Sequence, residues 1–168
     1  MIFANSVSDT TRKNVANHQS KLRIFVDADV LFAGSASTHE HSASLVILRM
    51  AEITLIEALS SEQVITEVKR NLEEKMPAAL PAFQMMVRRC LRVVSDPSSN
   101  EIKVLSNAAD PKEVPILAAA VREGCMYLTT YNIRHFQPGV ESVQVLKPGD
   151  LVQRIRYLLA QMSSDAPG

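Results

Sequence analysis

The chain has 168 residues, 46% of them hydrophobic, with 18 lysines and arginines balanced by 18 aspartates and glutamates. This length and composition suit one folded domain, and the neutral balance excludes a protein that binds nucleic acid through a high overall positive charge. The two cysteines form no metal-binding pair or disulfide framework, and no apolar stretch reaches membrane-spanning length, so we expect a cytoplasmic protein with no membrane partner.

Residues 1–20 are mostly polar and show no helical or strand period, so we interpret them as a flexible extension. A single domain is expected over 21–162, with a frayed end at 163–168. The apolar run 22–26 ends abruptly at Asp27, which is typical of a buried parallel strand. Further strands are expected at 53–59, 91–94, 127–130 and 143–146, a turn at 96–100, and helices at 44–51, 61–74, 77–90, 113–123 and after 148–150, where Asp150 is the expected cap.

This alternation of strands and helices with short links predicts an α/β fold. We expect a three-layer α/β/α sandwich with a central, mainly parallel sheet of four to five strands. In open sheets of this kind, ligands bind beyond the carboxyl ends of the strands. Polar residues that directly follow a strand are therefore the first candidates for a functional site.

Three acidic side chains are placed near this edge. Asp27 ends the most apolar strand and Asp29 follows it, although an Asx-turn or a helix cap also explains aspartates at such positions. Glu67 lies at the border of the apolar stripe of the helix 61–74, whose first turns follow a strand. A helical glutamate is more often simply solvated.

The segment 110–115, with sequence DPKEVP, brings two further carboxylates to the start of a helix. A capping role explains both acids without any chemistry. Pro115 is tolerated only in the first turn, so we expect the helix to start near Glu113 and Asp110 to lie in the preceding loop.

The loop after the strand 127–130 carries four polar side chains that end near the same edge: Thr130, Asn132, Arg134 and His135. An ordinary surface loop is the alternative interpretation. If Asp27, Glu67 and Glu113 converge, a divalent cation relieves their mutual repulsion, and oxygen-only ligands favour Mg²⁺ or Mn²⁺. Such a cation activates water and stabilises charge on a phosphoryl oxygen, which points to hydrolysis of a phosphodiester.

Three motifs, in order and with compatible spacing between residues 22 and 146, resemble those of PIN domains. IFVDADVL at 24–31 is similar to their opening strand and its D-x-N-V-L ending. SEQVITEV at 61–68 contains their helical acid at Glu67. EVPILAAA at 113–120, with Gly124 and YLTT after it, is similar to their D-x-P-I-L-A-A-A…G…Y-L-V-T block.

The resemblance implies a three-layer α/β/α sandwich and a Mg²⁺- or Mn²⁺-dependent ribonuclease acting on RNA. Many single-domain bacterial relatives are toxins held inactive by an antitoxin protein, and homodimers are common. Matched by position, the implied catalytic residues are Asp27, Glu67, Glu113 and Asn132, and Asp27, Glu67, Glu113 and Asp110 are the implied metal ligands. We assign substrate binding to Asp29, Thr130, Arg134 and His135.

The chain departs from the family pattern at three positions. Glu113 stands where the family has Asp, Asn132 where relatives often have Asp, and Asp29 where the family has Asn. These changes leave open a degenerate PIN fold that binds RNA or a protein partner without catalysis. A second alternative is a phosphatase of the haloacid dehalogenase type, with Asp27 as nucleophile and Asp29 as acid, although its downstream acidic pair is missing.

Overall fold

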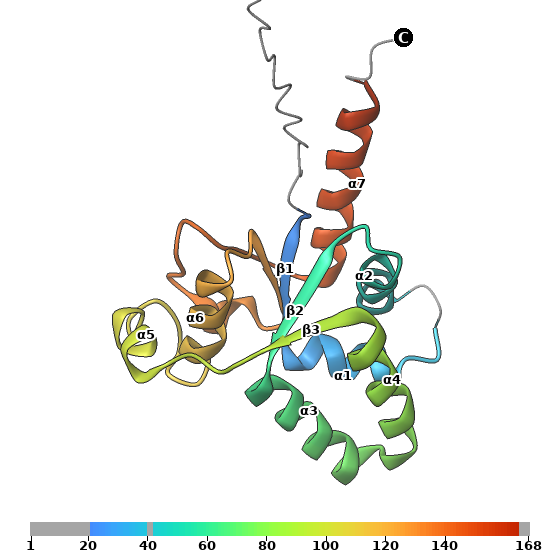
Figure 1. Cartoon of the computed structure of the whole chain (residues 1–168), viewed down its shortest axis with the longest axis horizontal. Coiled ribbons are helices and arrows are strands. Elements are labelled where there is room, and N and C mark those ends of the chain that lie inside the picture. The colour runs from blue at the N-terminus through green and yellow to red at the C-terminus, as the bar shows by residue number, and fades with distance from the viewer. Residues whose placement is uncertain (1–20, 40–41, 165–168) are drawn as a thin grey trace, which may run out of the picture.

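A computed structural model describes residues 21–39 and 42–164 (Figure 1). The predicted extension 1–20 lies outside the described residues, as do 165–168. The strands are β1 (Arg23–Val26), β2 (Glu57–Ser61), β3 (Leu91–Val94), β4 (Tyr127–Thr129) and β5 (Gln144–Leu146). The α-helices are α1 (Ala28–Ala36), α2 (Ala43–Glu52), α3 (Glu62–Lys75), α4 (Leu80–Cys90), α5 (Ser99–Val104), α6 (Val114–Arg122) and α7 (Pro148–Ser164). Two 3₁₀ turns, η1 (Pro77–Ala79) and η2 (Ile133–Phe136), complete the described elements.

The five strands form one sheet in the order β3-β2-β1-β4-β5, and every neighbouring pair is parallel. The chain builds outward from β1 to β3, then returns to the other side of β1 at β4. The strand order therefore reverses between β1 and β4, and in open parallel sheets ligands bind beyond the carboxyl ends of the strands at such a reversal. This topology confirms the predicted α/β class and its parallel sheet.

Helices cover both faces of the sheet (Figure 1). On one face α2 packs against α1, α4 and α7, while α5 and α6 pack together on the other. β1 is the centre of the core, since Ile24, Phe25 and Val26 have no exposed surface. Among the described residues, no helix is long and apolar enough to cross a membrane.

Helix α1 was not predicted, because its short apolar sequence follows β1 without a turn. Asp27 makes the direct transition from strand to helix: its backbone is extended, and its side chain caps α1 by accepting from the N–H of Ala28. A single residue thus ends the strand and begins the helix.

Three local predictions need correction. The strand expected at 53–59 begins only at Glu57, because Thr54 adopts a positive φ of 64° and the chain turns there. The turn expected at 96–100 ends at Ser98, which forms a capping box with Glu101 and starts α5. Helix α7 begins at Pro148, so Asp150 lies in its first turn instead of capping it, and the helix continues to Ser164.

Candidate active site

Asp27 lies at the reversal of strand order, where β1 and β4 end. Its backbone N–H donates to the carbonyl of Thr129 on β4 (3.1 Å), and its Oδ1 accepts from the N–H of Ala28 (2.7 Å). Only 7% of the residue is exposed. Burial, followed by the nearby charge of Asp29, raises the pKa of Asp27 from 3.8 to about 7. The site is therefore built around a rigid, desolvated carboxyl group.

Asp29 lies in the first turn of α1 and holds the loop that follows β4. Its Oδ2 accepts from Thr130 Oγ1 (3.2 Å), the N–H of Tyr131 (2.9 Å) and Asn132 Nδ2 (3.1 Å). Its other oxygen, Oδ1, is buried and has no hydrogen-bond partner among the described residues. Burial nevertheless raises the pKa of Asp29 more than the hydrogen bonds from Tyr131, Thr130 and the neighbouring backbone lower it.

Glu113 stands at the N-cap position of α6, as expected from Pro115, which lies in the first turn. Its side chain is partly buried and makes no capping hydrogen bond. Burial raises the pKa of Glu113, and the charge of Glu67 raises it further. Glu67, on α3, therefore lies close enough to Glu113 to act on it electrostatically. The helix α3 and the start of α6 thus contribute to the same charged region as Asp27 and Asp29.

Asp110 and His135 lie at the solvent side of this region. The N–H of Asp110 donates to the carbonyl of His135 (2.8 Å), and the N–H of Glu113 donates to the carbonyl of Asp110 (2.7 Å). His135 Nδ1 lies 3.5 Å from Asp110 Oδ2 and 3.9 Å from Glu113 Oε1. Asp110 is the more exposed of the two acids, with 57% of its side chain in solvent against 21% for Glu113.

The loop after β4 places the remaining predicted residues. Thr130 is completely buried, and its hydroxyl also accepts from the N–H of Asn132 (3.1 Å). Arg134 and His135 lie exposed on η2. Among the described residues, Arg134 has no hydrogen-bond or ion-pair partner.

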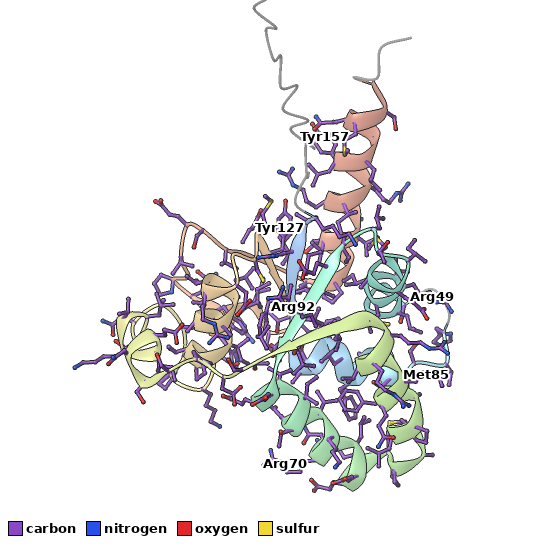
Figure 2. All side chains as sticks on the ribbon, viewed as in Figure 1. Arg49, Arg70, Met85, Arg92, Tyr127 and Tyr157 are labelled. Atoms are coloured by element: carbon purple, nitrogen blue, oxygen red, sulfur yellow. The ribbon has the colours of Figure 1, made fainter. Side chains whose placement is uncertain are left out.

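A groove of about 530 Å³ runs from Glu67 along α3. It is lined by Glu62, Gln63, Thr66, Glu67, Arg70 and Asp96. Figure 2 shows Arg70 near the bottom of the view and Tyr127, the first residue of β4, well above it, so this groove lies toward the carboxyl end of the strands. Thr66 and Asp96 were not among the predicted site residues. Asp96 is distant from α3 in the sequence, and its side chain contacts the start of that helix by accepting a hydrogen bond from the N–H of Gln63 (2.8 Å).

The donor chemistry of this region fits a hard divalent cation. All candidate ligands are oxygens, Asp27 is desolvated, and one buried oxygen of Asp29 lacks a donor. Within 21–39 and 42–164, however, no three His, Cys, Asp or Glu side chains are close enough together to hold one ion. The side chains of Glu67 and Glu113, which are both partly buried, therefore do not form an ion site with Asp27 in the described arrangement.

The comparisons with known proteins agree with this fold. The family model of the PIN domain matches residues 23–134, and the chain belongs to this family. Among solved structures, it is similar to PAE2754 from Pyrobaculum aerophilum, with 17% identity, a TM-score of 0.59, and coverage of 81% of this chain and 96% of that one. Comparison with curated protein sequences gave no match.

Two further solved structures are similar. VapBC2 from Rickettsia felis, bound to a DNA fragment from their promoter, has 12% identity and a TM-score of 0.55, covering 74% of this chain and 98% of that one. The Sarcin-Ricin loop cleaving toxin VapC20 from Mycobacterium tuberculosis has 15% identity and a TM-score of 0.49, covering 70% and 97%. At these identities the likeness concerns the fold.

Proposed function

We propose that this protein is a metal-dependent ribonuclease that hydrolyses RNA phosphodiester bonds. One observation carries the proposal: a buried aspartate at the switch point of a PIN fold, Asp27, has its pKa raised to about 7 within a group of carboxylates. Burying acids together costs stability in the metal-free protein, and perturbed carboxylates of this kind are typical of functional sites.

Asp27, Glu67 and Glu113 would hold Mg²⁺ or Mn²⁺, with Asp110 as the alternative acid on the solvent side. When bound, the cation supplies an activated water and neutralises charge on the phosphoryl oxygen. Asp27 is suited to a fixed ligand position because the backbones of β1, β4 and α1 hold it. Glu67 and Glu113 have longer side chains and supply the movable ligands.

The loop after β4 would contact the substrate. Arg134 is exposed and unpaired among the described residues, so its guanidinium is free to bind an RNA phosphate. His135 lies beside Glu113 and is placed to contact the same backbone, while the buried Thr130 fixes the loop. Asn132 adds a neutral amide to the catalytic group.

The partners follow from the family resemblance and belong to the same proposal. They are RNA, an antitoxin protein and a second copy of the chain in a homodimer, in the cytoplasm. Light scattering coupled to size-exclusion chromatography measures the homodimer directly. A mass near twice 18.5 kDa supports it, and a mass near 18.5 kDa contradicts it.

Two alternative functions are a PIN fold that binds RNA or protein without cleaving it, and a phosphatase. The replacement of family acids at Glu113 and Asn132 favours a degenerate site that binds RNA or protein without cleaving. The phosphatase alternative requires Asp29 as a free acid, but its Oδ2 is already occupied by three donors. Membership of the PIN family also favours the nuclease.

The test is incubation of the purified protein with a mixed cellular RNA pool and Mn²⁺, with cleavage sites read by end-specific sequencing. The proposal predicts discrete cleavage that EDTA abolishes and that Asp27→Asn and Glu67→Gln lose. Glu74→Gln, an exposed acid on the same helix, is the matched control and should cleave normally. RNA that is retained by the protein but stays intact would establish the degenerate site instead.

A further inference from the structure

Tyr131 presents an aromatic ring at the surface of the loop after β4. Of the aromatic side chains within 21–39 and 42–164, only those of Tyr131 and Tyr157 are exposed, with 43% and 54% of each residue in solvent. Arg154 covers one face of the Tyr157 ring, 5.8 Å from its centroid, whereas no cation among the described residues lies over the Tyr131 ring. Tyr131 is therefore the aromatic surface that this loop offers to a ligand.

The orientation of Tyr131 is fixed at both ends of the residue. Its backbone N–H donates to Asp29 Oδ2 across 2.9 Å, and its hydroxyl lies 2.8 Å from the hydroxyl of Ser44, in the first turn of α2. Ser44 and the adjacent Thr130 are completely buried, so well-packed groups hold the residue on both sides. The direction of the ring is set before a ligand arrives, which reduces the entropy lost on binding.

We propose that the Tyr131 ring stacks on one base of single-stranded RNA, next to the phosphate assigned to Arg134. Arg134 lies in the same loop, three positions further along, and is exposed. Aromatic rings that stack on bases, combined with cations that bind the backbone, hold single-stranded nucleic acid without reading its sequence. The inference rests on the proposed function, because it assumes RNA as the ligand. It assigns substrate binding to a residue outside the predicted site.

The surroundings of the ring favour a base over a protein surface. The exposed residues that follow it in the loop are polar: Asn132, Arg134 and His135. Among the described residues, no other exposed large apolar side chain lies in this loop. A protein partner is bound through a contiguous apolar patch, whereas a stacked base needs one ring face and its phosphate needs an adjacent cation.

The alternative role of Tyr131 is to fasten the loop to α2 through its hydroxyl. The two roles depend on different parts of the side chain, since fastening requires the hydroxyl and stacking requires the flat ring. Tyr131→Phe removes the hydroxyl and keeps the ring. Tyr131→Leu removes both and keeps an apolar side chain that can pack against α2. The difference between these two variants therefore reports the aromatic ring.

The test measures the affinity of the full-length chain for labelled oligoadenylate and oligouridylate by fluorescence anisotropy. The parent is Asp27→Asn, in which the proposed function excludes cleavage. Adding Tyr131→Leu should weaken oligoadenylate binding about 5-fold or more, while Tyr131→Phe should retain most of the affinity. The loss should be smaller for oligouridylate, because pyrimidines stack less strongly than purines. Tyr157→Leu is the matched control on α7 and should bind both RNAs as the parent does.

Equal oligoadenylate affinity in Tyr131→Phe and Tyr131→Leu overturns the inference and leaves the proposed function standing, because the ring then makes no contribution to RNA binding. An equal loss in Tyr157→Leu overturns it as well, since the effect is then not specific to this loop. If the parent binds too weakly to measure while the wild type cleaves, the same changes are compared through KM, which only Tyr131→Leu should raise. Absence of both RNA binding by the parent and cleavage by the wild type refutes both proposals.

Discussion

Replacing Asp27 by asparagine should stabilise the metal-free protein above neutral pH. Asparagine caps a helix as well as aspartate does, so the start of α1 is kept while the ionisable group is removed. The pKa of Asp27 rises from 3.8 to about 7 on folding, which corresponds to about 4 kcal/mol of unfolding free energy lost once the group ionises.

The sign of the pH dependence follows from proton binding. Between pH 4 and 7 the native state still holds a proton on Asp27 that the unfolded state has released. The stability that this group contributes therefore falls as pH rises through that window, by up to about 1.4 kcal/mol per pH unit, and levels off above pH 7.

Urea unfolding in EDTA from pH 4.5 to 8.5 measures the effect. The difference in unfolding free energy between Asp27→Asn and wild type should grow across this range and then become constant. Mg²⁺ should stabilise the wild type at pH 8 and leave the variant unchanged. Parallel pH profiles for the two proteins would refute the assignment of a raised pKa to Asp27.

Four further substitutions distinguish residues that contribute to binding from residues that contribute only to stability. Glu113→Gln should weaken Mn²⁺ binding by about 10-fold or more, measured by titration calorimetry, and unchanged affinity would exclude Glu113 as a ligand. The same change should stabilise the metal-free protein at pH 8 in urea unfolding, because burial and Glu67 raise the pKa of Glu113. Arg134→Ala should weaken RNA binding in a filter assay while leaving Mn²⁺ affinity unaltered; a loss of metal affinity would contradict its position on η2. Ser98→Ala should cost about 1 kcal/mol in urea unfolding by removing the capping box of α5, with no change in Mn²⁺ binding. Leu128→Ala, in the fully buried β4, should cost about 2–5 kcal/mol in the same assay, and a smaller loss would mean that the core around β4 is loosely packed.

The parts of the fold with strong local signals were predictable. The strand at 91–94 and the start of α6 near Glu113 agree with the structure, because hydrophobic patterning and Pro115 define them locally. Helix α1 was missed because only Asp27 separates this nine-residue helix from β1, so the sequence carries no turn signal between the two elements. The false start of β2 at Ile53 arose because β-branched residues there form the turn after α2.

In the candidate site, too, the features with local sequence signals were predictable and those that depend on tertiary contacts were not. The topological rule for parallel sheets placed Asp27, Glu113 and the loop after β4 at one edge. The rule gave no information on the contact between Asp29 and Asn132, because these residues are 103 positions apart in the sequence. At these two positions the chain has Asp where the family has Asn, and Asn where relatives often have Asp. The burial that raises the pKa of Asp27 likewise depends on packing that no local pattern encodes.

The proposed activity depends above all on whether the carboxylates at the switch point bind a divalent cation. Isothermal titration of Mn²⁺ into the wild-type chain, Asp27→Asn, Glu113→Gln and the control Glu74→Gln tests this without knowledge of the RNA substrate. We expect saturable Mn²⁺ binding in the wild type and in the Glu74→Gln control, and loss of binding in Asp27→Asn and Glu113→Gln. Absence of binding at millimolar Mn²⁺, or equal binding in all four proteins, would contradict it.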